Sequence, residues 1–262
     1  MTAVRAEVPI DIRFPETAER HLRVSVGACR MQIQPGTDDA WVTGRYQDPT
    51  GALPLTVTQE GGTATLRQQP NWPGTIPNLS APARLELSLG TGQPFRMTVD
   101  SGAAEATIDL GAVRLQDLSL RFGAGKATVD FGRPNPEMLR RFEIKAGAVG
   151  LDLRNLANAG FEQFVLEGGA ASYHLAFGGT LQRSAEARIS AGMSSIEIDV
   201  PSSTAAKITA VANLGSLDVG DGFTTRERAF WTQPALSTAP AILTISATVA
   251  LGSLRLRSSG PA

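Results

Sequence analysis

The feature that most constrains the fold of this chain is a short segment that recurs along much of its length. Eight segments fall into register when each is numbered from a small residue at its start. They begin at Gly27, Gly102, Gly123, Gly147, Gly169, Gly192, Asn213 and Ala250. From Gly102 to Asn213 the starts are 21, 24, 22, 23 and 21 residues apart, and the step to Ala250 is 37. A repeat of this length is typical of chains that stack one structural unit.

Each unit alternates apolar and polar residues on both sides of its small residue. Position 7 is aliphatic in all units: Ile33, Ile108, Val129, Leu153, Leu175, Ile198, Val219 and Leu256. Position 5 is apolar and position 6 polar, and apolar residues recur before the start, as at Leu118, Leu120 and Phe122. This alternation indicates a strand with one buried face. Each unit is therefore predicted to be a strand, a glycine-containing corner, a second strand and a return loop.

The repeat predicts an all-β fold, a parallel β-solenoid (β-helix-like) of roughly 22-residue repeats with a less regular N-terminal part. In such a stack each residue lies over its equivalent in the next coil, about 4.8 Å away. Similar aliphatic residues then form columns, as the Ile, Leu and Val residues of position 7 do. Glycine permits the sharp bend or close backbone approach that the corners need. The alternative is a β-sandwich whose strands resemble one another by coincidence.

The chain divides by the regularity of the repeat. Residues 1–92 are predicted to be an N-terminal cap and first strands, continuous with a regular β-solenoid over 93–258 that carries a loop insertion at 220–240. Within the first part a hairpin is predicted about Glu60-Gly61-Gly62. The proline-rich stretch 70–83 is predicted to be a loop.

Composition narrows the classes of function and the location. The formal net charge of −1 argues against a nucleic-acid partner, which favours a basic face. Cys29 is the only cysteine, so no disulfide can form within the chain. The first 24 residues do not read as a secretory signal, and no stretch reaches the 18 apolar residues of a spanning helix. We therefore expect a cytoplasmic location without membrane insertion.

Position 6 places charged residues in a column on the predicted outer face. Asp152, His174 and Glu197 follow one another in adjacent coils. Such a group could perform acid–base chemistry or bind a metal, but exposed ion pairs that keep a sheet face soluble give the same pattern. We favour the ion pairs, and predict no catalytic residue, metal or other cofactor. Asp109 and Asp130, at position 8, would stand ~5 Å apart as in retaining glycosidases, but stacking imposes that spacing on any repeated residue.

Aromatic residues in the loops are the best binding candidates. Phe223, Phe230 and Trp231 lie in the insertion and Trp72 in the proline-rich stretch, with Trp41 and Tyr46 nearby in the N-terminal part. Loop aromatics often anchor protein partners or sugars. The alternative is that they cover the open ends of the core. For the insertion we expect packing against the last coils, which would leave a monomer or weak dimer.

The end of the stack needs protection from edge pairing. The last unit carries Arg255 and Arg257 and is followed by a Ser-Gly-Pro tail. We expect these charges and the proline to guard the outer edge.

Several of these segments resemble the toast-rack family of bacterial proteins, which is related to the putative-adhesin and LiaF-like cell-wall-active-antibiotic-response β-solenoids. The resemblance is carried by the units at 102–131, by GGAASYHLAFGGTL (168–181), by SAGMSSIEIDVPSST (190–204) and by ALGSLRLRS (250–258). It covers roughly residues 20–258 and implies a repeat-built β fold with no catalytic residue. LiaF-like relatives are implicated in envelope-stress signalling through N-terminal membrane helices, which are not recognisable in this sequence.

Together these observations favour a non-enzymatic structural or interaction module, a scaffold or sensor related to bacterial envelope stress. The expected partner is another protein or a second copy of the chain. The alternative is a carbohydrate-binding or carbohydrate-active protein that uses an outer face. A pocket lined by carboxylates and aromatic rings would favour this alternative, and a flat, evenly charged surface would favour the scaffold.

Overall fold

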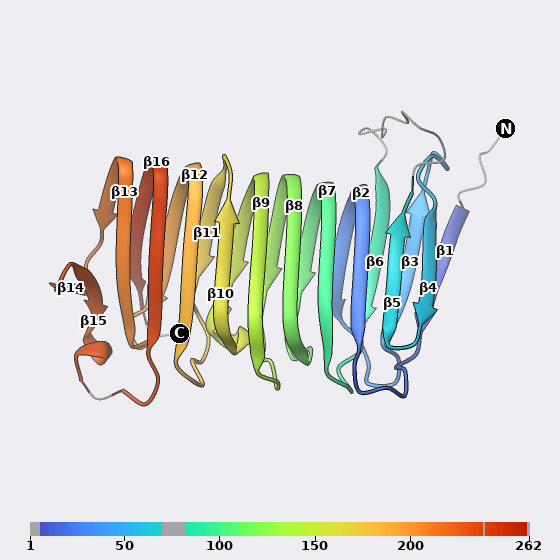
Figure 1. Ribbon diagram of the computed structural model, residues 1–262, viewed down its shortest axis with the longest axis horizontal. Coiled ribbons are helices and arrows are strands. Elements are labelled where there is room, and N and C mark those ends of the chain that lie inside the picture. The colour runs from blue at the N-terminus through green and yellow to red at the C-terminus, as the bar shows by residue number, and fades with distance from the viewer. Residues whose placement is uncertain (1–5, 70–81, 238, 261–262) are drawn as a thin grey trace.

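The computed structural model describes residues 6–69, 82–237 and 239–260, and it confirms the predicted all-β fold (Figure 1). Within these ranges sixteen strands form one sheet, accompanied by two short 3-10 helices. The strands are β1 Ala6–Ile12, β2 His21–Pro35, β3 Val42–Asp48, β4 Leu55–Glu60, β5 Thr63–Gln68, β6 Ala83–Leu89, β7 Phe95–Asp109, β8 Leu115–Asp130, β9 Leu139–Arg154, β10 Phe161–Gly168, β11 Ser172–Ala176, β12 Ala185–Pro201, β13 Ala206–Val219, β14 Phe223–Arg226, β15 Ala229–Thr232 and β16 Leu243–Ser259. The helices are η1 Leu156–Ala159 and η2 Gln233–Leu236.

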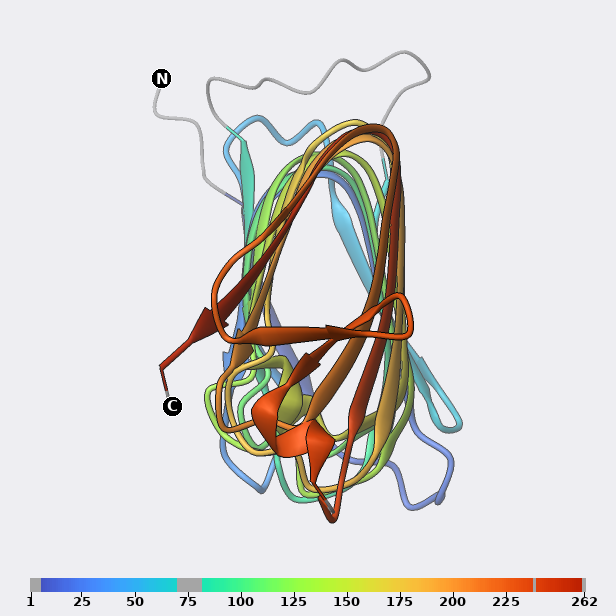
Figure 2. The same cartoon turned by 90° about the vertical axis from the view of Figure 1, so that its left-hand side faces the viewer.

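Seven long strands of 14 to 17 residues dominate the molecule: β2, β7, β8, β9, β12, β13 and β16. Each runs through the predicted corner without a break, bending there from one face of the molecule to the other (Figure 2). Neighbouring long strands pair in parallel, and β10 and β11 together supply the coil between β9 and β12. The strands therefore superpose along the long axis of the molecule (Figures 1 and 2).

The strand register puts equivalent positions of the repeat opposite one another. Ile33 pairs with Ile108, Ile108 with Val129, and Val129 with Leu153. The column continues through Leu175, Ile198, Leu256 and Val219. Its members are at most 1% exposed, apart from the last, which is half-buried. Parallel stacking in register thus makes one continuous apolar core between the two faces.

The corner glycines are needed because consecutive backbones approach closely there. A Cβ on Gly102 would lie 2.6 Å from the carbonyl oxygen of Gly27. On Gly123 and Gly147 it would lie 2.4 Å from the carbonyl oxygen of the preceding corner glycine. None of these glycines has a positive φ. Close approach, and not a left-handed conformation, therefore explains this glycine column.

The order of the last coils differs from the sequence order. β16 lies between β12 and β13, so the closing unit of the chain is an internal coil and β13 forms the end of the stack. The expectation that Arg255 and Arg257 guard the outer edge is therefore wrong. Their side chains instead form ion pairs with Asp218 and Glu197 on the neighbouring strands. The 37-residue step allows this order because it is long enough to carry the chain past β13 and back.

The N-terminal end of the stack is closed by additional strands. β2 pairs with β5 along its first half and with β6 along its second, and the antiparallel strands β4, β3 and β1 extend these two edges. Pairing of Glu60 with Thr63 confirms the predicted hairpin. Gln68 completes the corner, where its Oε1 accepts hydrogen bonds from the backbone N–H groups of Gly27 and Ala28 at 2.8 and 3.1 Å.

Candidate functional site

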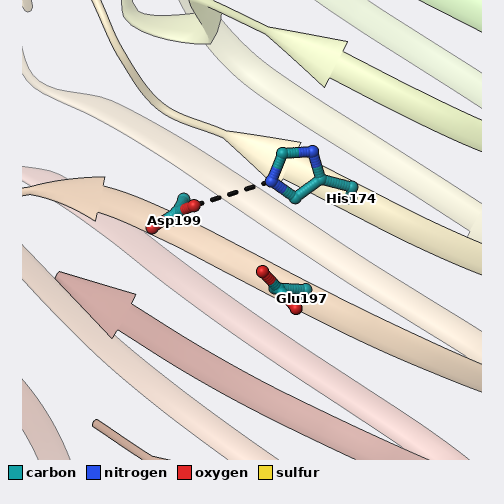
Figure 3. Close-up of side chains that lie close together, drawn as sticks. All are labelled: His174, Glu197 and Asp199. Carbon is teal, nitrogen blue, oxygen red and sulfur yellow. Dashed lines mark ion pairs between the residues drawn. The ribbon is translucent and has the colours of Figure 1, made fainter. Parts of the chain in front are cut away.

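The charged column predicted at position 6 lies on the outer face of β9, β11 and β12 (Figure 3). Asp152 is opposite His174, which is in turn opposite Glu197. The His174 ring donates from Nδ1 to Asp152 Oδ1 at 2.8 Å, and its Nε2 lies 3.6 Å from Asp199 Oδ2. The imidazole is thus held between two carboxylates on adjacent coils. Asp199, at position 8, contacts the ring in a way that the column alone did not predict.

Arginine side chains pair with two of the carboxylates of this cluster. Arg154 donates to Asp152 Oδ2 from Nε and Nη2 at 2.8 and 2.5 Å. Arg257 lies with its Nε 3.2 Å from Glu197 Oε1. Two of the three carboxylates therefore have a guanidinium partner of their own. Their charges are compensated within the cluster.

The electrostatics of the cluster favour the charged forms of His174 and Asp152. Partial burial alone would lower the pKa of His174, but hydrogen bonds to Asp152 and Asp199 and the charges of Asp152 and Glu197 outweigh it and raise that pKa. Burial likewise opposes the lowered pKa of Asp152, which results from hydrogen bonds with Arg154 and His174. A raised pKa is the direction expected for a histidine held between two carboxylates.

The same geometry defines what chemistry the cluster can perform. One ligand atom from each of His174, Glu197 and Asp199 lies within 4.8 Å of the others, which is close enough to surround a cation. A histidine binds a metal only through a neutral ring nitrogen. Here both nitrogens of His174 face carboxylates and the raised pKa favours the imidazolium. The donor set therefore fits an ion-pair ladder better than a metal site.

The aspartates considered as a glycosidase pair have structural roles in the return loops. Asp109 and Asp130 are opposite each other on β7 and β8. Asp109 Oδ1 accepts from the backbone N–H of Gly111 at 2.8 Å, and Asp130 Oδ1 accepts from Asn155 Nδ2 at 2.8 Å. Each carboxylate thus fixes the turn that follows its own strand or the next.

Cys29 is buried, and burial raises the pKa of its thiol to about 12, which suits a packed residue.

Three of the four aromatic binding candidates lie together on the β14–β15 hairpin. Phe223 and Phe230 are partly buried and pack against the core. The ring of Trp231 has Lys207 Nζ 5.1 Å from its centroid and donates from Nε1 to the carbonyl of Arg226 at 3.3 Å. These contacts follow the predicted packing of the insertion against the last coils. The fourth candidate, Trp72, lies outside the described residues.

The N-terminal aromatic residues are part of the core. Trp41 and Tyr46 are fully buried, and Trp41 packs between the rings of Phe14 and Phe95. Covering the open end of the core is therefore their role, as the alternative interpretation of the sequence proposed.

Sequence reasoning missed a cluster of exposed apolar side chains on the last three coils. Met193 on β12 is opposite Leu251 on β16, which is opposite Leu214 on β13. All three stand at position 2 of the repeat, where the earlier units have alanine: Ala28, Ala103, Ala124, Ala148 and Ala170. Val211 and Leu217 on β13 are also exposed. The change from alanine to large apolar residues was the signal in the sequence that could have revealed this cluster.

Among the described residues, no helix has both the length and the apolar character needed to cross a membrane.

Known proteins resemble this chain only distantly in structure. A putative cell adhesion protein from Clostridium sporogenes has 11% identity and a TM-score of 0.46, covering 98% of this chain and all (100%) of its own. A putative adhesin from Bacteroides fragilis has 10% identity and a TM-score of 0.42, covering 97% and 98%. A putative lipid binding protein from Parabacteroides distasonis has 10% identity and a TM-score of 0.41, also covering 97% and 98%. Similarities this weak carry no inference about function.

Sequence comparison is more informative. No curated protein matches the chain. The family described as the N-terminal domain of toast_rack, DUF2154, matches residues 3–140, which are 138 of the 262 residues and so more than half of the chain. The protein therefore belongs to this toast_rack family.

Proposed function

We propose that this chain is a non-enzymatic interaction module, built as a parallel β-solenoid, whose binding surface lies at the end of the stack formed by β12, β16 and β13. One observation carries the proposal. Of the seven exposed large apolar side chains among the described residues, five lie on these three strands: Met193, Val211, Leu214, Leu217 and Leu251. Apolar side chains that gather on one part of a surface mark a site of interaction with another molecule.

The parallel register of the long strands supports the proposed solenoid. Each long strand contributes one residue to every column, and the column of position 7 passes through coils from β2 to β13. Repeated units that contact only their neighbours form an extended scaffold with two ends. The end that exposes apolar side chains is then the natural place for a partner.

The charged cluster supports a non-enzymatic role. A general base needs a free lone pair directed at a substrate. In this cluster Asp152 is held by Arg154 and His174, and Glu197 by Arg257. The aromatic hairpin lies on β14 and β15, whereas the charged column lies on β9, β11 and β12. A carbohydrate site that combines carboxylates with exposed rings therefore has less support than a protein-binding end.

The proposed role extends to a scaffold or sensor in bacterial envelope stress, located in the cytoplasm. Its support is the sequence resemblance to families linked to envelope stress. Fractionation of bacteria that produce the chain tests the location. Recovery in the envelope fraction would contradict it.

The binding surface can be tested by photo-crosslinking in cells that produce the chain. Benzoylphenylalanine is incorporated in place of Leu214, which is 71% exposed, and in place of Thr107, an exposed residue on β7 in the middle of the stack. We expect protein adducts from position 214 and few from position 107. Equal labelling from both positions, or none from position 214, would refute the proposed surface.

A further inference from the structure

The core is only partly covered at the β13 end of the stack. Leu217 occupies position 5 and is 39% exposed. The residues at the same position in the other seven coils are at most 3% exposed: Met31, Ala106, Ala127, Leu151, Tyr173, Ile196 and Leu254. Leu217 is exposed because no further coil lies over β13 in the described part of the chain. Leu217 therefore occupies a core position of the repeat but is exposed to solvent, because it lies on the end coil.

The hairpin covers only the beginning of this end coil. β15 pairs with β13 at Lys207 and Ile208 alone. Along residues 209–219, β13 pairs with β16 on one side and with no described strand on the other. Unpaired N–H and C=O groups of an edge strand are a template for pairing with another strand.

The exposed edge lacks the residues that usually prevent such pairing. Residues 209–219 read TAVANLGSLDV and contain no proline and no basic residue. The only charged side chain is Asp218, and Arg255 Nε neutralises it at 2.8 Å. An edge of this composition is open to strand addition.

One of the outer edges at the opposite end of the stack, that of β1, is protected. β1 forms an outer edge there and carries Pro9 at its centre, which cannot donate to a ladder. Glu7 and Asp11 on the same strand are exposed. The β1 edge is therefore protected from strand pairing by proline and charge, whereas the β13 edge is not.

We propose that the occupant of the β13 edge is a second copy of this chain, bound through its own β13 in an antiparallel pair about a two-fold axis. This inference rests on the proposed function and names its partner. Among the described edges, segment 209–219 is the longest one without proline or a basic residue, so we take the second copy to offer the same segment. A pairing of identical edges closes on itself and stops at two subunits, whereas β13 pairing with β1 would continue into a filament.

The pleat of β13 selects the register of this pair. Before the corner Ala210 and Ala212 pack against the core, and after it Val219 does so, with Leu217 two residues earlier on the same face. Inward residues of the two copies face each other when Ala212 lies opposite Leu217 of the second copy. Ala210 then lies opposite Val219, and the two cores become continuous.

The same register is compatible with the charges and with the exposed apolar residues. Asp218 lies opposite Val211 of the second copy, so no like charges face each other. Leu214 lies opposite Gly215, which places both Leu214 side chains beside the two-fold axis. Leu214, the most exposed large apolar residue among those the structure describes, is then at the centre of the interface.

Sedimentation velocity over a concentration series tests the proposal with the full chain. We expect a monomer–dimer equilibrium with no larger species. Leu214→Lys brings two ammonium groups together at the axis and should raise the dissociation constant at least about tenfold, which corresponds to about 1.4 kcal/mol. Thr107→Lys adds the same charge at an exposed site away from the edge and should leave the equilibrium unchanged. Circular dichroism shows that each variant is folded.

Three outcomes would overturn the inference. The first is a chain that stays monomeric at millimolar concentration, the second a dimer that Leu214→Lys does not weaken, and the third open-ended growth beyond the dimer. The crosslinking experiment separates this failure from failure of the proposed function. Adducts of position 214 with a different protein and none between copies would refute the dimer but leave the binding surface. No adducts at all would refute both.

Discussion

Asn135, in the return loop after β8, offers the sharpest test of how the coils are held together. It is 1% exposed and makes four hydrogen bonds to the backbone of its own loop and of both neighbouring coils. Its Nδ2 donates to the carbonyls of Leu115 and Ala159 at 2.9 and 3.2 Å. Its Oδ1 accepts from the N–H groups of Leu115 and Glu137 at 3.2 and 3.0 Å.

Asn135→Ala removes all four hydrogen bonds and leaves buried backbone groups without partners. At ~1 kcal/mol for each net hydrogen bond, the free energy of unfolding should fall by on the order of 3–5 kcal/mol. Urea denaturation followed by circular dichroism measures the change, and Thr107→Ala, at an exposed site, should stay within ~0.5 kcal/mol of the wild type. A loss below ~1 kcal/mol for Asn135→Ala would show that water replaces the side chain and that the hydrogen bonds of Asn135 do not hold the return loops together.

Three further predictions concern the core and the charged column. Leu153→Ala, at a fully buried position 7, should lower the free energy of unfolding by ~2–5 kcal/mol. Leu217 is 39% exposed on the end coil, so Leu217→Ala should lower the free energy of unfolding of the dilute monomer by less. Equal losses for the two variants would contradict the open end. An NMR titration of the two histidines should give His174 a pKa above its ordinary value and His21 one below it, because burial, Arg23 and Arg96 disfavour the charged His21 ring; the reverse order would refute the ion-pair ladder. Since folding raises the pKa of His174, its contribution to stability is fully present below its unfolded pKa of about 6.5 and is lost as the pH rises through the folded value, so the stability advantage of the wild type over His174→Gln should shrink over that window.

The repeat made the long strands predictable, because every column rests on apolar and polar residues that alternate along each strand with a period of two. Position 7, the corner glycines and the Asp152–His174–Glu197 column could all be read from single units. The return loops could not, since they have no periodicity, and so Asn135 and its equivalent Asn158 gave no signal. The side chain of Gln68, which completes the first corner, acts only through a strand that is distant in the sequence.

The stacking order was hidden for a different reason. At positions 5 to 7, β13 reads Leu-Asp-Val and β16 reads Leu-Arg-Leu, so both fit the same apolar slots. The pattern within a unit predicts that the unit stacks on another coil, but it does not indicate which coil is the neighbour. Only a comparison between units could have placed β16.

Charge provides one such comparison. Sequential stacking would put Asp218 of β13 directly against Glu197 of β12, and like charges opposite each other in a sheet are destabilising. With β16 between them, Arg255 pairs in register with both acids. The outer column then reads Asp152, His174, Glu197, Arg255, Asp218 and alternates in sign when His174 is protonated. The raised pKa of His174 is part of the same alternation.

The apolar residues favour the same order. β16 buries Val249 and Leu256, whereas β13 has Ala212 and Val219 at the equivalent positions. Val to Ala and Leu to Val together remove about three methylene groups, each worth ~0.8 kcal/mol on burial. With β13 at the end in place of β16, less apolar surface is exposed, and the fold is more stable by roughly 2 kcal/mol. The same consideration limits the proposed dimer, because an end coil already reduced to Ala210 and Ala212 gains less on association than a coil with larger inward residues would. The dimer should consequently be weak enough for its equilibrium to be followed at ordinary protein concentrations, and an association too tight to dilute apart would contradict this origin of the interface.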